Sequence, residues 1–126
     1  MDAFGHVNNI VYLQYFESAR IAYFERLEFS SIEAVGPILA STECRYKLPL
    51  TYPDTVSVGA KVVALSGDRL TQHYAVFSQR HQRIAAAGQG VIVAYDYRQS
   101  RKTQVPEVIR DRLLALEGGS SLPATE

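Results

Sequence analysis

Apolar side chains at helical spacing over residues 9–27 constrain the fold of this chain more than any other feature. They recur at steps of three and four residues, which predicts an amphipathic α-helix about 28 Å long. Asn8 or Asn9 is suited to cap its start. One stripe consists of Ile10, Leu13, Phe16, Ala19, Tyr23 and Leu27, and it is widened by Tyr12, Ile21 and Phe24. We therefore expect other elements to wrap around this helix.

Two charged residues, Glu17 and Arg20, lie three residues apart on the predicted helix. At this spacing they can form an ion pair that makes a partly buried charge tolerable. An ordinary pair on a solvated surface explains the spacing equally well.

After the helix, hydrophobic residues alternate with a period of two, which predicts antiparallel β-strands. Four segments show this alternation, namely residues 38–48, 56–64, 70–79 and 84–97. On the inner face of the first we expect Ile38, Ala40, Thr42, Cys44, Tyr46 and Leu48. On the inner face of the second we expect Val56, Val58, Ala60, Val62 and Ala64. The last two segments form a hairpin around a polar turn at residues 80–83.

The fourth segment contains a run of alanine, glycine and glutamine from Ala85 to Gly90. Small residues make a poor strand by themselves, so the run indicates that something approaches the sheet closely there. The long helix and a bound ligand are the two candidates. We favour packing of the helix.

A short C-terminal helix is predicted to begin at Pro106, because proline suits the first turn of a helix. Its apolar residues are Ile109, Leu113 and Leu116, and Gly118-Gly119 provides a stop. The order of elements is one long helix, four antiparallel strands and a small helix, which is an α+β fold. We expect one domain over residues 1–119 and a disordered tail over residues 120–126.

Charge and composition narrow the classes of partner. Hydrophobic residues make up 47% of the chain and the formal net charge is +0, which argues against binding to nucleic acid or to a membrane surface. The single cysteine, Cys44, cannot form an internal disulfide, and no apolar run approaches the roughly 20 residues that span a bilayer. Without a signal-peptide pattern at the N-terminus, we expect a cytoplasmic protein.

The residues before the long helix are the best candidates for chemistry. Asp2 precedes Asn9 by seven residues, and Gly5 between them lets the backbone turn back. The unpaired N–H groups of a helix's first turn favour negative charge and can polarise a carbonyl group. We therefore expect the Asp2 carboxylate and these amides to face the same carbonyl carbon.

The N-terminal segment resembles the opening of hotdog-fold acyl-CoA thioesterases of the 4-hydroxybenzoyl-CoA thioesterase type. The resemblance rests on Asp2-Ala3-Phe4-Gly5-His6-Val7-Asn8-Asn9, followed by Tyr12, Tyr15-Phe16-Glu17 and Ala19-Arg20. It implies a curved antiparallel sheet wrapped around one long central helix, with active sites built where two subunits meet. Such proteins have a strand before the aspartate, and here only Met1 precedes it. A missing first strand is therefore expected, either because the natural chain is longer, which we favour, or because the sheet has four strands.

The resemblance implies hydrolysis of an acyl-CoA thioester to a carboxylic acid and coenzyme A. Asp2 would act as nucleophile or as general base, and the backbone N–H of Asn9 would bind the thioester oxygen. Gly5 would allow the turn, while His6 and Asn8 would be polar neighbours of the carboxylate or substrate. Tyr12 would line the acyl pocket.

No metal or redox cofactor is expected, because the sequence has neither metal-ligand spacing nor a glycine-rich phosphate loop. Coenzyme A enters only as part of the substrate, and its phosphates call for basic residues. The candidates are Arg69, Arg98, Arg101 and Lys102 at one end of the predicted sheet, and Arg80 and Arg83 at the other. The sequence leaves that choice open.

We expect a homo-oligomer, either a dimer or a dimer of dimers, because an open sheet leaves an edge to be covered. Two alternative functions remain at this point. One is hydrolysis of acyl carrier protein thioesters, and the other is a catalytically silent dimer that binds acyl groups or serves as a scaffold.

Overall fold

The computed structural model describes residues 9–29, 34–51, 53–119 and 122–124. The predictions for Asp2, Gly5, His6 and Asn8 therefore lie outside the described residues.

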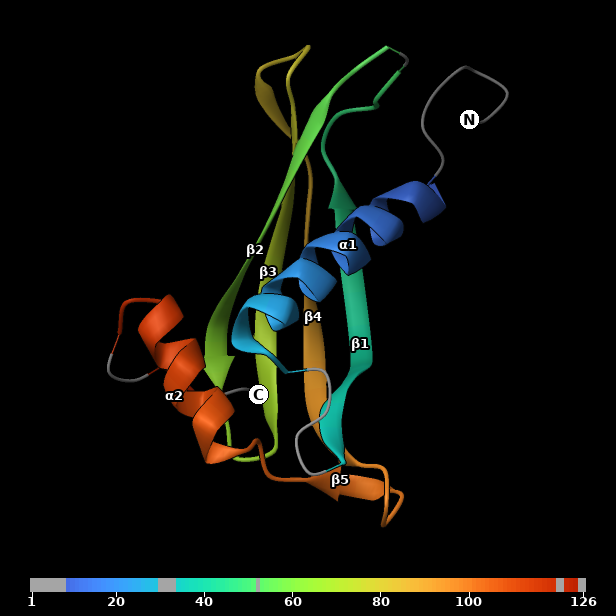
Figure 1. Ribbon diagram of the computed structural model, residues 1–126. Coiled ribbons are helices and arrows are strands. Elements are labelled where there is room, and N and C mark those ends of the chain that lie inside the picture. The colour runs from blue at the N-terminus through green and yellow to red at the C-terminus, as the bar shows by residue number, and fades with distance from the viewer. Residues whose placement is uncertain (1–8, 30–33, 52, 120–121, 125–126) are drawn as a thin grey trace.

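A long helix crosses one face of an antiparallel sheet, and a short helix lies beside the end of one strand (Figure 1). The elements are α1 (Asn9–Leu27), β1 (Val35–Tyr46), β2 (Val56–Leu65), β3 (Arg69–Ser78), β4 (Arg83–Asp96), β5 (Arg101–Thr103) and α2 (Glu107–Leu116). The strand order is β1-β4-β3-β2, with β5 paired to β4. The predicted α+β class is confirmed, and the prediction of four strands is corrected by β5. Three residues are too few to show a period of two, so β5 left no signal in the sequence.

The helix α1 has the predicted bounds, but the sheet covers only one side of it. Five of its residues are buried, namely Tyr12, Phe16, Tyr23, Phe24 and Leu27. By contrast, Ile10 is 64% exposed, Ile21 is 50% exposed and Leu13 is 39% exposed. The expectation that Ile10 and Leu13 lie in the core is thus wrong for the single chain, because its sheet packs on α1 through β2 and β3.

Irregularities in two strands move residues to the face opposite the predicted one. In β1 the register shifts between Leu39 and Ser41. Leu39 pairs with Ile92, which belongs to the core cluster that contains Tyr23 and Phe24 of α1, whereas Ile38 pairs with Val93, which lies outside that cluster. Directly paired residues share a face, so Leu39 faces inward and Ile38 outward. In β2 a shift after Val62 makes Leu65 the next buried position in place of Ala64. The predictions for Ile38 and Ala64 were wrong because a bulge reverses the alternation.

The small residues of β4 lie beneath α1, as predicted. A Cβ atom on Gly88 would overlap the carbonyl oxygen of Glu43 and would lie 2.6 Å from Cε2 of Phe16. A Cβ atom on Gly90 would lie 2.9 Å from the hydroxyl oxygen of Tyr74. The run therefore makes room for core packing against the helix.

The predicted ends of the C-terminal helix are confirmed. Pro106 is the N-cap of α2, and Gly118 has a φ of +74°, a left-handed conformation that glycine adopts without strain. Ile109 and Leu113 anchor the helix in the core. Within the segment predicted as a tail, the carbonyl oxygen of Pro123 accepts a hydrogen bond from the N–H of Leu65 at 2.7 Å.

One carboxylate joins α2 to the rest of the molecule. Oε2 of Glu117 accepts hydrogen bonds from the Tyr23 hydroxyl of α1 and, at 3.0 Å, from the N–H of Val62 in β2. Burial and the hydrogen bond to Glu117 hold the pKa of Tyr23 far above its usual range, so its hydroxyl remains a donor. Glu117 therefore satisfies two donors, one beside the irregularity in β2.

Replacing Glu117 by alanine is expected to lower the free energy of unfolding by about 1–3 kcal/mol, because both donors lose their acceptor. Urea denaturation monitored by circular dichroism measures this change. Asp111→Ala, on an exposed position of the same helix, is the matched control and should change stability by about 0.5 kcal/mol or less. Equal losses in the two variants would contradict the role given to Glu117.

Candidate functional site

The described part of the predicted site is the start of α1. Asn9 is the first residue of this helix and is exposed, so its backbone N–H lies at the helix N-terminus as the prediction requires. Tyr12, one turn later, is buried. The roles predicted for these two residues stay predictions, as do those of Asp2, Gly5, His6 and Asn8, which lie before the described helix.

Aromatic side chains form the wall next to the first turn of α1. The ring of Tyr12 packs edge-to-face against Tyr46 of β1, with centroids 5.2 Å apart, and against Tyr15 at 6.3 Å. Burial raises the pKa of Tyr12 above its usual range. At neutral pH this hydroxyl is therefore a hydrogen-bonding group and not a base. Alternation along the strand had placed Tyr46 on the inner face, but it could not show that Tyr46 meets Tyr12.

The free thiol of Cys44 lies near this wall and is half-buried. Burial raises its pKa, and a hydrogen bond with Tyr46 only partly offsets that shift. Because the thiolate is the nucleophilic form of cysteine, a raised pKa leaves Cys44 unreactive at neutral pH. The start of α1 therefore contains no activated cysteine among the residues that the structure describes.

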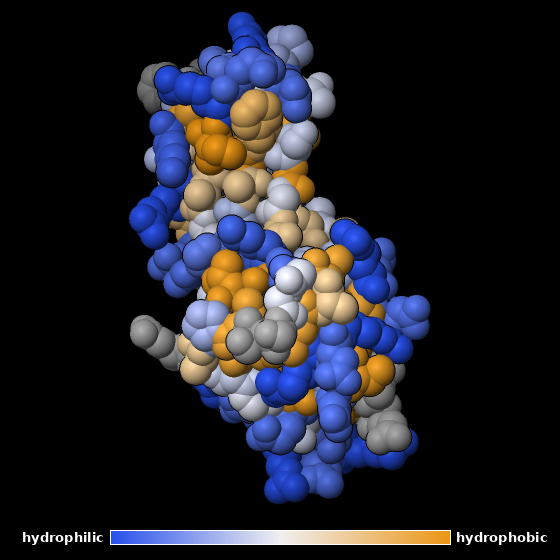
Figure 2. All heavy atoms as spheres, turned by 90° about the vertical axis from the view of Figure 1, so that its left-hand side faces the viewer, coloured by the Kyte–Doolittle hydropathy of each residue, from blue (hydrophilic) through white to orange (hydrophobic). Residues whose placement is uncertain are grey.

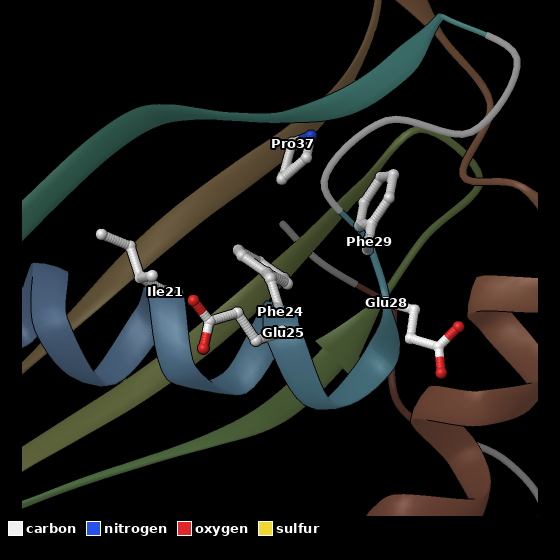
Figure 3. Close-up of a pocket in the computed structure, with 6 residues that line it drawn as sticks. All are labelled: Ile21, Phe24, Glu25, Glu28, Phe29 and Pro37. Carbon is white, nitrogen blue, oxygen red and sulfur yellow. The ribbon is translucent and has the colours of Figure 1, made fainter.

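A cavity of about 480 Å³ opens between the second half of α1 and the start of β1 (Figure 3). Its lining residues are Ile21, Phe24, Glu25, Glu28, Phe29 and Pro37. Phe24 and Phe29 stand edge-to-face at 5.9 Å, and Pro37 faces them from β1, while Glu28 points away from Pro37. The cavity is therefore largely apolar with a carboxylate edge. The cavity could not be predicted from the sequence, because no local pattern links residues 21–29 to Pro37.

The cavity and the start of α1 are far apart within one chain. Phe24 lies fifteen positions after Asn9 in the helix, which corresponds to about 22 Å along the axis. A small acyl group bound at Asn9 therefore cannot reach this cavity in the same subunit.

The side chains of Arg20, Tyr74 and Gln72 form a series of hydrogen bonds that leads from α1 into the core. Nη1 of Arg20 donates a hydrogen bond to the Tyr74 hydroxyl at 3.4 Å, and that hydroxyl donates to Oε1 of Gln72 at 2.8 Å. The Tyr74 ring stacks on Phe16 with centroids 4.9 Å apart.

Between the described residues the ion pairs are Arg45–Glu43 and Arg69–Asp68, so the predicted option of a Glu17–Arg20 pair is wrong. Arg20 turns toward the sheet, where it meets Tyr74.

The basic residues considered for phosphate binding differ in their surroundings. The guanidinium group of Arg69 pairs with Asp68 at 3.0 Å, and Nη1 of Arg80 donates to the carbonyl oxygen of Pro53 at 3.4 Å. Lys102 and Arg101 lie on β5, opposite Tyr95 and Asp96 of β4. The exposed cations of β5 thus lie at the end of the sheet where β1 begins.

Two further properties follow from the described parts of the chain. Their His, Cys, Asp and Glu side chains do not form a group of three that can hold a metal ion. None of the helices seen there has the length and apolar character needed to cross a membrane.

Figure 2 shows apolar side chains interspersed with hydrophilic ones on the face that it presents.

A comparison with protein families and a comparison with solved structures both find thioesterase-like proteins similar to this chain. The profile of the thioesterase-like superfamily matches residues 1–113. A solved structure of a thioesterase from Thermus thermophilus, complexed with coenzyme A and Zn, is similar, with 36% sequence identity and a TM-score of 0.80. The match covers 94% of this chain and 86% of that one.

Two relatives are similar in sequence. The uncharacterized protein YsmA of Bacillus subtilis is 34% identical over 74 residues, which are 58% of this chain and 50% of the relative. The chloroplastic acyl-acyl carrier protein thioesterase ATL3 of Arabidopsis thaliana is 28% identical over 118 residues, which are 90% of this chain and 62% of the relative. The chain thus spans between half and two thirds of the length of these relatives.

Proposed function

Because this chain belongs to the thioesterase-like superfamily, we propose that it hydrolyses an acyl-CoA thioester to a carboxylic acid and coenzyme A. The observation that carries the proposal is the family match over residues 1–113, which includes the segment from Asp2 to Asn9 and the whole of α1. The hotdog fold expected from the sequence is confirmed by the similarity to the Thermus thermophilus structure.

Two routes are open for the chemical step. In the first, a carboxylate oxygen of Asp2 attacks the thioester carbon, the thiolate leaves and takes a proton, and water hydrolyses the resulting mixed anhydride. In the second, Asp2 takes a proton from the attacking water, and that proton passes to the departing thiolate. In both, the N–H of Asn9 donates to the oxygen on which negative charge develops.

The other predicted site residues support this step around the carbonyl group. Gly5 allows the turn that brings Asp2 back toward Asn9, and His6 and Asn8 supply polar contacts to the carboxylate or to the substrate. Tyr12, buried against Tyr46, lines the first part of the acyl site.

A second copy of the chain completes this site. The strand β1 is twelve residues long and lies at one end of the strand order, so no strand in the described part of the chain pairs with its outer edge. In a two-fold antiparallel pair of β1 strands, Tyr46 of one subunit lies near Val35 of the partner subunit. The start of α1 then approaches the other subunit's cavity beside Pro37. This arrangement favours a dimer, or a dimer of dimers, as the active form.

Replacing Leu39 by lysine is expected to weaken self-association about tenfold or more, because Leu39 is a 37% exposed apolar residue on β1 and an unpaired charge is costly in an interface. Ile84→Lys is the matched control, since Ile84 is 38% exposed on a different strand. Light scattering over a micromolar concentration series measures the change. A monomeric parent protein at these concentrations would contradict the proposed assembly.

The same assembly selects one of the two basic groups for the phosphates of coenzyme A. Pro37 of the cavity pairs with Ala94, and Ala94 pairs with Thr103 of β5. Arg101 and Lys102 therefore lie at the cavity's end of the sheet, near the proposed active site of the partner subunit. Arg80 and Arg83 belong to the turn at the opposite end. We assign the phosphates to the β5 group.

Release of free thiol from short, long and aromatic acyl-CoAs tests the proposed activity. Turnover of at least one of these thioesters is expected. The similarity to the Arabidopsis thaliana acyl-acyl carrier protein thioesterase favours one second candidate, in which the acyl group arrives on a carrier protein, and the same assay on acyl carrier protein thioesters examines it. Saturable binding of acyl-CoA without release of thiol from any substrate would support a silent binding module.

A further inference from the structure

The sheet has a second face that α1 does not contact. In Figure 1 α1 lies in front of the sheet, and the Phe16 ring of α1 stacks on Tyr74 and lies close to Gly88. Successive residues of a strand point to opposite faces, so the residues on either side of Tyr74 and Gly88 face away from the helix. The buried residues of α2, Ile109 and Leu113, belong to the core cluster that also contains residues of α1. In the part of the chain that the structure describes, neither helix therefore packs on this second face.

Strand pairing places two rows of residues on that face, because directly paired residues share a face. The first row has a charged residue at each end and consists of Glu43, Gln89, His73 and Lys61, from β1, β4, β3 and β2 in that order. The second row has small residues beside one arginine and consists of Arg45, Ala87, Ala75 and Gly59. We call the residues of these two rows the outer face.

Small side chains leave hollows in the outer face. A hollow of about 240 Å³ reaches from Arg45 to His73, and another of about 440 Å³ reaches from His73 to Gly59. A Cβ atom on Gly59 would have no heavy atom within 4 Å, and Ala75 and Ala87 are partly exposed. A sheet face that stays in water carries polar side chains, whereas alanine forms the centre of this face. The outer face is therefore shaped to receive side chains from a facing surface.

The charges at the two ends of the first row are opposite. Glu43 lies on β1 and Lys61 on β2, which are the first and last strands in the order β1-β4-β3-β2. Among the described residues Lys61 has no ion pair, and the ion pair of Glu43 with Arg45 is 4.0 Å long and exposed. The outer face thus offers one acidic and one basic group to a second charged surface.

A second copy of the chain matches this pattern. A two-fold axis that runs along the strands between β3 and β4 places β1 of one copy over β2 of the other. Glu43 then lies over Lys61 of the partner subunit, and Gln89 lies over His73 of the partner subunit. Each contact occurs twice, as in every two-fold interface. A two-fold axis that runs across the strands would instead place Glu43 over Glu43 of the partner subunit, where like charges repel.

The second row fits the same arrangement. Ala87 lies over Ala75 of the partner subunit, so the two sheets can approach to the spacing of about 10 Å that packed sheets have. Arg45 lies over the hollow at Gly59 of the partner subunit, which has room for its long side chain. Aligned sheets cross at about 30° in proteins, and long charged side chains at the row ends still reach each other at this angle. Charge and shape therefore select the same partner.

We propose that the outer face binds the outer face of a second copy of this chain, around a two-fold axis between β3 and β4. The inference goes beyond the proposed function, because the start of α1 and the cavity beside Pro37 lie on the other side of the sheet and stay open. The outer face is also separate from the edge of β1, so both contacts can form at once. Together they join four subunits as a dimer of dimers.

Reversing one charge tests the proposal. Size-exclusion chromatography with light scattering at micromolar concentration is expected to give the parent protein the mass of four subunits. In Lys61→Glu two carboxylates meet at both ends of the interface, which should weaken this contact about hundredfold or more and halve the mass. Glu43→Lys should have the same effect. A protein with both substitutions has opposite charges at each end again and should regain the mass of four subunits.

Arg26→Glu is the control, because it reverses a charge at an exposed position of α1 and should keep the parent mass. A Lys61→Glu protein with the parent mass would overturn the proposal and leave the outer face to water or to another protein. A mass that the double substitution does not restore would also overturn it, because the two residues would then not face each other. Leu39→Lys acts on the edge of β1 instead, and it should leave pairs of subunits joined by the outer face.

The outcome is independent of the proposed activity, because mass and thiol release are measured separately. If the parent protein has two subunits, Lys61→Glu decides which contact holds them together. A monomeric variant would then support the outer face, and an unchanged dimer would overturn the proposal. A monomeric parent protein would overturn it as well.

Discussion

Replacing Asp2 by asparagine is expected to lower kcat for acyl-CoA hydrolysis by about a hundredfold to ten-thousandfold. Asparagine has almost the same size as aspartate, but it can neither attack the thioester carbon nor accept a proton from water. Binding of acyl-CoA should persist, because the helix N-terminus and the apolar cavity are unchanged. Thiol release measures kcat, and isothermal titration calorimetry measures binding.

Asp111→Asn, the same change at an exposed position of α2, is the control and should keep the parent turnover. Parent-like turnover by the Asp2→Asn protein would remove Asp2 from the mechanism and leave the helix N-terminus and bound water as the remaining catalytic groups. A single turnover in water enriched in heavy oxygen separates the two routes. Label in the Asp2 carboxylate indicates the mixed anhydride, whereas label only in the product acid indicates general-base catalysis.

Replacing Gly88 by alanine is expected to lower the free energy of unfolding by about 3 kcal/mol. The added methyl group meets the backbone carbonyl of Glu43 on the neighbouring strand and the ring of Phe16 on α1. Neither can move away easily, because Phe16 is fully buried and Glu43 is part of the β1–β4 ladder. Either β1 or α1 must therefore shift. Urea denaturation of the purified variant measures the loss.

The chain offers a matched control for this prediction. A Cβ atom on Gly59 of β2 has no heavy atom within 4 Å, so Gly59→Ala adds the same methyl group to a strand without crowding. It should be neutral or slightly stabilising, because alanine restricts the unfolded chain more than glycine does. A Gly88→Ala protein as stable as the Gly59→Ala protein would contradict the close packing of α1 on β4.

Local signals predicted much of the fold correctly. The period of apolar residues and the asparagines before it gave the bounds of α1, and Pro106 and Gly118 gave the ends of α2. The small residues of β4 indicated close packing of the helix. These features depend on sterics and hydrogen bonds within a few residues, so the sequence contains them directly.

The candidate site was predicted less completely. Its N-terminal residues came from a motif, and of these the structure describes only Asn9 and Tyr12. The contact between Tyr12 and Tyr46, the cavity beside Pro37 and the polar chain from Arg20 to Gln72 were all missed. Each of these features involves residues from different elements, and the spacing of residues along the sequence does not indicate such a contact.

By itself, then, the sequence determined the two helices, the four longer strands and the family to which the chain belongs, because these are properties of local pattern and motif. The tertiary structure alone decided that Leu39 and not Ile38 faces α1, and that Arg20 turns to Tyr74 instead of Glu17. The physical reason is that the position of a strand irregularity and the formation of a buried polar contact both depend on the partner residue that lies opposite in the folded chain. That partner is distant in the sequence, so its identity is fixed only when the chain has folded.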